Sequence, residues 1–250
     1  MAGFKAHFFT AAVVGGIGAT SLLSAGMLDQ NSLLLCFAAV VLGGILPDID
    51  SDTSTVLTVS FTSFSIIFSF FIIMSQAEYL STIELLLFWF GVFLLFKLVV
   101  FGLFTSLTVH RGIFHSIPAA FLSMFICSIS LSRLYSLDNR TVWVVSGFLF
   151  IGFMIHLILD ELNSLNIFNL GGVSKSFGTA IKFYSPNIAA TGLLYLATAT
   201  LYTLTPATDD LLTTITDPAT WQQVEENFYP SNGWFTGIKF KIWQWWSFSN

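Results

Sequence analysis

The sequence predicts an all-α fold, a polytopic membrane helical bundle with about seven transmembrane helices. Hydrophobic residues make up 55% of the 250 residues and charged residues only 9%, whereas a soluble domain usually carries about 25% charged residues. The mean hydropathy is +0.80. Lipid must therefore cover much of the surface, so the bilayer is the first expected partner. With a net charge of −5 and no long basic run, the chain is not expected to bind nucleic acid.

Seven apolar stretches define the expected helices, and most approach the roughly 20 residues that a spanning helix needs. The second stretch is short. The third is rich in Ser and Thr, whose hydroxyls can bond to helix backbone, and the fourth is long enough to tilt or to extend beyond the bilayer. In chain order the stretches are residues 8–27, 32–46, 56–75, 83–109, 113–131, 141–159 and 188–205.

A change of composition after residue 205 divides the chain into two parts. Residues 1–205 form the predicted transmembrane metal-site domain. Residues 206–250 form a C-terminal tail that is first polar and acidic and then rich in Trp. Aromatic and basic residues together favour the headgroup layer, which predicts an interfacial tail, and the alternative is a loosely ordered aromatic segment.

His and Asp residues gather at the ends of the predicted helices. They lie at the start of the first helix, the end of the second, the end of the fourth, the start of the fifth and the end of the sixth. Because successive helices alternate in direction, these ends share one membrane face. Ionisable residues at membrane depth are costly and indicate function by default. The candidate metal ligands are His7, Asp48, Asp50, His110, His115, His156 and Asp160.

The residue types and spacings are typical of a transition-metal site. His156 and Asp160 are four residues apart, so both project from one helix face. Asp48 and Asp50 can chelate one ion or bridge two, or they form a solvated turn or cap. Imidazole and carboxylate together suit Zn, Mn or Fe better than Ca. Seven candidates exceed the four ligands of a closed zinc site, which favours two ions, or one ion with a general base.

Two basic residues have a functional and an ordinary interpretation. Arg111 lies between His110 and His115, and its guanidinium could donate two parallel bonds to a phosphate or a developing oxyanion. Lys97, within the fourth stretch, could pair with a site carboxylate. Both side chains could instead snorkel to the interface. The candidate catalytic residues are Asp48, Arg111 and Asp160.

Three segments resemble the signatures of the YdjM/YbcI family. They are Leu-Pro-Asp-Ile-Asp-Ser at 46–51, His-Arg-Gly-Ile-Phe-His-Ser at 110–116 and His-Leu-Ile-Leu-Asp at 156–160. His7 also fits the family's pattern, and the resemblance covers about residues 1–187. It implies an inner-membrane, metal-dependent hydrolase with the seven candidate ligands at its site. The name LexA-binding is also attached to some members.

The leading hypothesis is a membrane-embedded, metal-dependent hydrolase that acts on a lipid-linked ester or phosphoester at the membrane face. The alternatives are a membrane protein that binds or transports a metal ion or proton, and a regulatory membrane protein with a structural metal site. We expect an inner-membrane protein of a prokaryote. The positive-inside rule favours a cytoplasmic site, because four basic residues are expected on the site face. These are Lys5, Arg111, Lys175 and Lys182.

Overall fold

The structure is a computed structural model that describes residues 3–24, 26–50, 82–100, 115–164, 181–185 and 187–228, with residues 62, 65, 66, 68, 69 and 72. Within these residues the regular structure is helical and includes eight α-helices, which confirms the all-α class. They are α1 (Phe4–Ser24), α2 (Gln30–Ile45), α4 (Thr82–Leu94), α6 (Ile117–Tyr135), α7 (Asn139–Ser164), α8 (Ile188–Tyr202), α9 (Asp209–Thr216) and α10 (Pro218–Phe228). A 3₁₀-helix, η1 (Leu46–Asp50), continues α2, and a π-helix, η2 (Leu95–Val100), continues α4.

Four helices of the described chain are long and apolar enough to cross a bilayer. They span Phe4–Leu23, Gln30–Asp48, Ile117–Tyr135 and Asn139–Ser164. They correspond to the first, second, fifth and sixth predicted stretches. Helix α8 covers the last stretch with only 15 residues, fewer than the roughly 20 of a full span. Most of stretch 56–75 and residues 101–109 lie outside the described residues, so the count of about seven spans stays a prediction.

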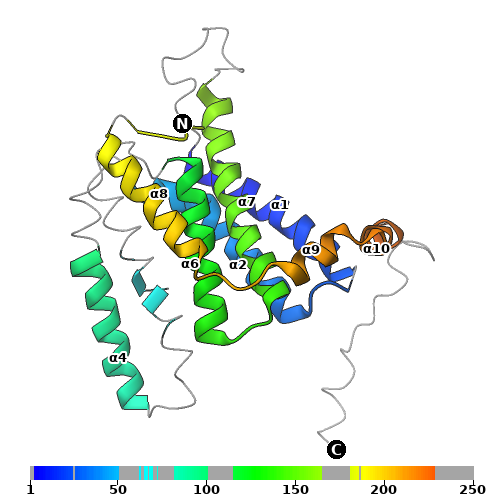
Figure 1. The fold of residues 1–250 in the computed structure, drawn as a ribbon, viewed down its shortest axis with the longest axis horizontal. Coiled ribbons are helices and arrows are strands. Elements are labelled where there is room, and N and C mark those ends of the chain that lie inside the picture. The colour runs from blue at the N-terminus through cyan, green and yellow to red at the C-terminus, as the bar shows by residue number, and fades with distance from the viewer. Residues whose placement is uncertain are drawn as a thin grey trace, which may run out of the picture.

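Helix α7 is the central element of the bundle. It contacts α1, α2, α6 and α9, and α8 packs on α6 (Figure 1). Its buried residues follow a helical spacing that includes Val145, Phe148, Gly152 and His156, and residues at this spacing lie on one face. Because α7 touches helices on several sides, the buried side chains of His156 and Asp160 near its end lie between neighbouring helices and not against lipid.

Glycines allow α2 and α7 to pack backbone against backbone. A Cβ atom added at Gly152 would lie 2.8 Å from the Val40 carbonyl carbon and 2.9 Å from the Gly44 nitrogen. A Cβ added at Gly43 would lie 2.9 Å from the Phe153 nitrogen. Between membrane helices, association depends on such close packing of small residues, because lipid is as apolar as the helix surface. Gly43 and Gly152 therefore allow the close approach of α2 and α7.

Short capped connections turn the chain at the end of the bundle away from the candidate ligands. Asp29 caps α2, and its carboxylate accepts a hydrogen bond from the Ser32 N–H at 2.8 Å. Hydrogen bonds from Ser32 lower the pKa of Asp29. Asp138 accepts from the Thr141 N–H at 2.9 Å at the start of α7. Burial raises the pKa of Asp138, but the hydrogen bonds from Thr141 and the charge of Arg140 outweigh it and lower that pKa.

Residues 209–228, in the polar part of the predicted tail, form two helices, whereas the Trp-rich part, for which an interfacial position was predicted, lies outside the described residues. Helix α9 packs on α7, and α10 packs on α1 (Figure 1). Acidic residues in the first turn of α9 suit the helix dipole, and Pro218 opens α10 at a position that Pro favours. The indole N–H of Trp143 also donates to the carbonyls of Pro206 and Ala207, at 3.2 and 3.1 Å. These bonds attach the segment before α9 to the first turns of α7.

Candidate metal centre

The candidate centre lies where the starts of α1 and α6 meet the ends of α2 and α7. His7 belongs to α1, and Asp48 belongs to η1 directly after α2. His115 comes just before α6, and His156 with Asp160 lies near the end of α7. Two overlapping groups have ligand atoms within 4.8 Å of one another, namely His7, His156 and Asp160, and Asp48, His115 and His156.

Local sequence explains how Asp48 and His115 reach this point. The buried Pro47 lacks a backbone N–H, so it cannot continue the hydrogen bonding of α2, and the chain tightens into η1. On the other side, the buried Ser116 caps α6 by accepting from the Ala119 N–H at 3.4 Å. Pro118 occupies the first turn of α6, where its missing N–H is harmless. Both ligand positions are therefore fixed by helix ends.

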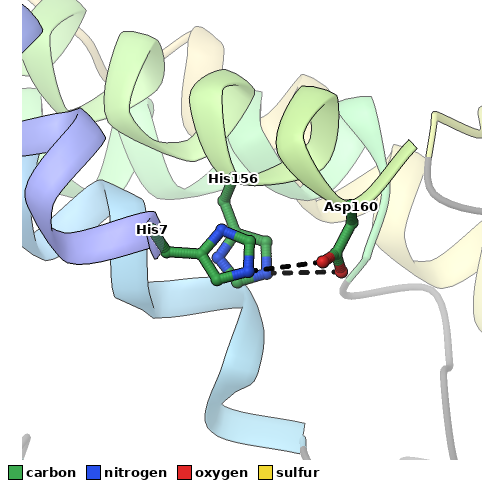
Figure 2. Close-up of side chains that lie close together, drawn as sticks. All are labelled: His7, His156 and Asp160. Carbon is green, nitrogen blue, oxygen red and sulfur yellow. Dashed lines mark ion pairs between the residues drawn. The ribbon is translucent and has the colours of Figure 1, made fainter. Parts of the chain in front are cut away.

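The side chains of His7, His156 and Asp160 pack directly against one another (Figure 2). The imidazoles of His7 and His156 are stacked, with ring centroids 3.7 Å apart and an interplanar angle of 13°. His7 Nε2 lies 3.3 Å from Asp160 Oδ1, and His156 Nε2 lies 3.7 Å from Asp160 Oδ2. Both rings thus present the same nitrogen to one carboxylate.

Asp48 and His115 complete the cluster around His156. Asp48 Oδ1 lies 3.5 Å from His156 Nε2, and the ring of His115 lies 5.5 Å from that of His156 at 66°. The side chains of His7, His156 and Asp160 are at most 4% exposed, whereas that of Asp48 is 26% exposed. Asp48 is therefore the more accessible of the two carboxylates.

A backbone carbonyl fixes the orientation of His156. Its Nδ1 lies 2.8 Å from the carbonyl oxygen of Gly44, so Nδ1 carries the proton and donates to that carbonyl. Nε2 is then the nitrogen with the lone pair, and it faces Asp48 and Asp160. A carbonyl behind the ring is the usual second partner of a metal-binding His. The close approach of α2 and α7 at Gly44 and Gly152 makes this bond possible.

The spacing of these atoms fits a metal ion. Ligand atoms bound at about 2.0–2.1 Å around one Zn²⁺ lie roughly 3.0–3.4 Å from each other. The three His-to-carboxylate distances of 3.3, 3.5 and 3.7 Å are within a few tenths of that range. Nitrogen and carboxylate oxygen donors also match the set that Zn, Mn and Fe accept. Both groups of ligands could therefore hold a metal ion.

The structure brings together five of the seven predicted metal ligands. Asp50 lies in η1, but its side chain, like His110 and Arg111, is outside the described residues, so their roles stay predictions. Lys97, which was considered as a partner of a site carboxylate, donates to the hydroxyl of Thr62 at 2.6 Å. The five ligands brought together are His7, Asp48, His115, His156 and Asp160.

Sequence reasoning missed the Gly44 carbonyl and the Ser116 cap. The Gly43-Gly44 pair just before Pro47 was a signal for close helix packing, and the Ser-x-Pro order at 116–118 was a signal for a cap. No pattern in the sequence could show that the Gly44 carbonyl lies against His156.

Fold and site together define a helical membrane protein with a buried cluster of His and Asp residues that could hold a metal ion. A family model described as YdjM inner membrane protein matches residues 1–216. The chain therefore belongs to the YdjM inner membrane protein family, and it is an integral protein of the inner membrane. The match extends beyond residue 187, where the sequence resemblance was expected to end. A search of curated proteins found no match, and neither did a search of solved structures.

Proposed function

We propose that the protein is a metal-dependent hydrolase that acts on a lipid-linked ester or phosphoester at the membrane face. The observation that carries this proposal is the buried cluster at the helix ends, in which carboxylates and imidazoles from separate helices face one another at ligand spacing. Such groups are costly at membrane depth. If these helix ends served only the packing of the bundle, apolar residues would be expected at the positions of the cluster.

The buried and the more exposed side chains of the cluster have different proposed roles. A bound divalent ion would lower the pKa of water and polarise the scissile group. His7, His156 and Asp160 are buried and would hold the bound metal, and the Gly44 carbonyl orients His156. Asp48 is the accessible carboxylate. Its carboxylate would accept the proton that the attacking water loses.

The surroundings of the cluster support a substrate attached to lipid. Phe4 and Phe9, which flank His7 on α1, are 60% and 62% exposed, and Ile158 and Leu162, which flank Asp160 on α7, are 43% and 45% exposed. Large apolar side chains on the outside of a membrane bundle face acyl chains. The acyl-chain surface therefore reaches the level of the cluster. For the anionic part of a phosphoester, Arg111 remains the proposed binding residue.

The test is hydrolysis of defined lipids by the purified protein in detergent or liposomes with Zn²⁺, Mn²⁺ or Fe²⁺ supplied. We expect headgroup release, detected by mass spectrometry, and its loss in Asp48→Asn and Asp160→Asn. Glu161→Gln, a carboxylate change next to Asp160 but outside the cluster, should keep the activity. Metal-loaded protein that cleaves no ester or phosphoester across the panel but carries ions or protons across liposomes would replace this proposal with the transport alternative.

A further inference from the structure

We infer that the centre is built for two divalent ions bridged by the carboxylate of Asp160, with His7 on one ion and His156 on the other. This inference rests on the metal dependence of the proposed function and specifies how the chain meets it. The presence of these ligands is compatible with one bound ion and with two bridged ions. The orientation of the ligand side chains distinguishes the two arrangements.

The two oxygens of Asp160 face different imidazoles. Oδ1 lies 3.3 Å from His7 Nε2, and Oδ2 lies 3.7 Å from His156 Nε2. Two ligand atoms that share an ion lie roughly 3.0–3.4 Å apart. Each of the two pairs has this separation to within a few tenths of an ångström. A carboxylate that offers one oxygen to each of two such pairs is placed to bridge two ions.

The stacked rings give a second argument, independent of the carboxylate. A metal ion bound by an imidazole lies in the plane of the ring, on the lone pair of the nitrogen. The rings of His7 and His156 are nearly parallel, and both Nε2 atoms point toward Asp160 (Figure 2). Their lone pairs run side by side and do not converge on one point. The stacking distance of 3.7 Å matches the spacing of about 3.5–4 Å between the ions of two-metal sites.

The described side chains give the two ion positions different sets of protein ligands. His156 Nε2 shares its position with Asp160 Oδ2, with Asp48 Oδ1 at 3.5 Å and with His115. Among the described side chains, the other position has His7 and Asp160 Oδ1. Positions around an ion without a protein ligand hold water or substrate.

The experiment is a titration of the chelator-treated full chain in detergent with Mn²⁺. Bound metal is counted by elemental mass spectrometry and observed by electron paramagnetic resonance. We expect saturation at about two ions per chain. As the second ion binds, the hyperfine pattern of an isolated Mn²⁺ should give way to the broad signal of a coupled pair. Saturation at one ion, or two ions whose signals stay uncoupled, would overturn the inference even if the protein hydrolyses lipids.

Variants assign the ligands once the wild type shows a coupled pair. His7→Ala should remove one ion and leave one isolated Mn²⁺. Asp160→Asn should also remove the coupling, because an amide nitrogen cannot replace the second oxygen. The matched control Glu161→Gln should keep two coupled ions. A coupled pair that survives in folded His7→Ala protein refutes the assignment of His7. A coupled pair without any hydrolysis keeps the inference and refutes the proposed function, whereas no bound metal refutes both.

Discussion

Replacing Gly152 by Ala tests whether the contact between α2 and α7 organises the centre. The added Cβ would lie 2.8 Å from the Val40 carbonyl carbon and 2.9 Å from the Gly44 nitrogen, whereas unbonded carbon atoms prefer about 3.5–4.0 Å. The two helices must therefore separate by roughly 1 Å. The bond between His156 Nδ1 and the Gly44 carbonyl, now 2.8 Å long, would lengthen to roughly 3.8 Å, and a separation of about 3.6 Å or more is no longer a hydrogen bond.

Two costs follow from this separation. Overpacking costs about 1–3 kcal/mol, and the lost buried hydrogen bond adds about 1 kcal/mol. For a chain of this size, each 1 kcal/mol lowers the unfolding temperature by roughly 2–4 °C. Loss of the carbonyl partner of His156 should also weaken metal binding by about 10–100-fold.

The assay compares Gly152→Ala with Gly147→Ala in the same helix. A Cβ at Gly147 meets nothing within 4 Å, so this control gains helix propensity without a clash. Thermal unfolding in detergent and metal titration are measured for both variants. If Gly152→Ala unfolds at the same temperature as the control and binds metal equally well, the close helix contact does not organise the centre, and our reasoning is wrong.

Three further predictions concern the helix ends. The pKa of Asp138 is lower in the folded than in the unfolded chain. Its contribution to stability is therefore fully present above the unfolded pKa of 3.8 and is lost as the pH falls through the lowered pKa. The fall in unfolding temperature on acidification should be smaller in Asp138→Asn than in the wild type. Ser116→Ala removes the cap beside His115 and should cost about 1 kcal/mol and weaken metal binding, whereas Ser130→Ala, which loses only a bond within α6, should keep metal affinity unchanged. Trp143→Phe removes the indole bonds to the segment before α9, so limited proteolysis near residue 207 should become faster while metal content stays the same.

Helix length and alternating direction were enough to predict which side chains would meet. The starts of α1 and α6 and the ends of α2 and α7 follow from the apolar stretches. Those ends place His7, Asp48, His115, His156 and Asp160 together, as the structure does. The proximity of these five residues was predictable because the length needed to cross the bilayer fixes where a spanning helix starts and ends. Their role as metal ligands stays a prediction.

The internal geometry of the centre could not be predicted in the same way. The bond from His156 to Gly44 depends on the register between two helices that are far apart in the chain, and that register depends on the close contacts at Gly43 and Gly152. The helices α9 and α10 were missed for another reason. Their sequences are polar, and they depend on docking against α7 and α1.

The distribution of the ligands along the chain has a consequence for biogenesis. His7 and Asp48 are synthesised before His156 and Asp160, which belong to the later helix α7. Until α7 inserts, His7 and Asp48 lack their contacts with His156 and Asp160, which help to offset the cost of polar groups in the bilayer. Metal binding that uses His156 and Asp160 would therefore have to wait for the insertion of α7.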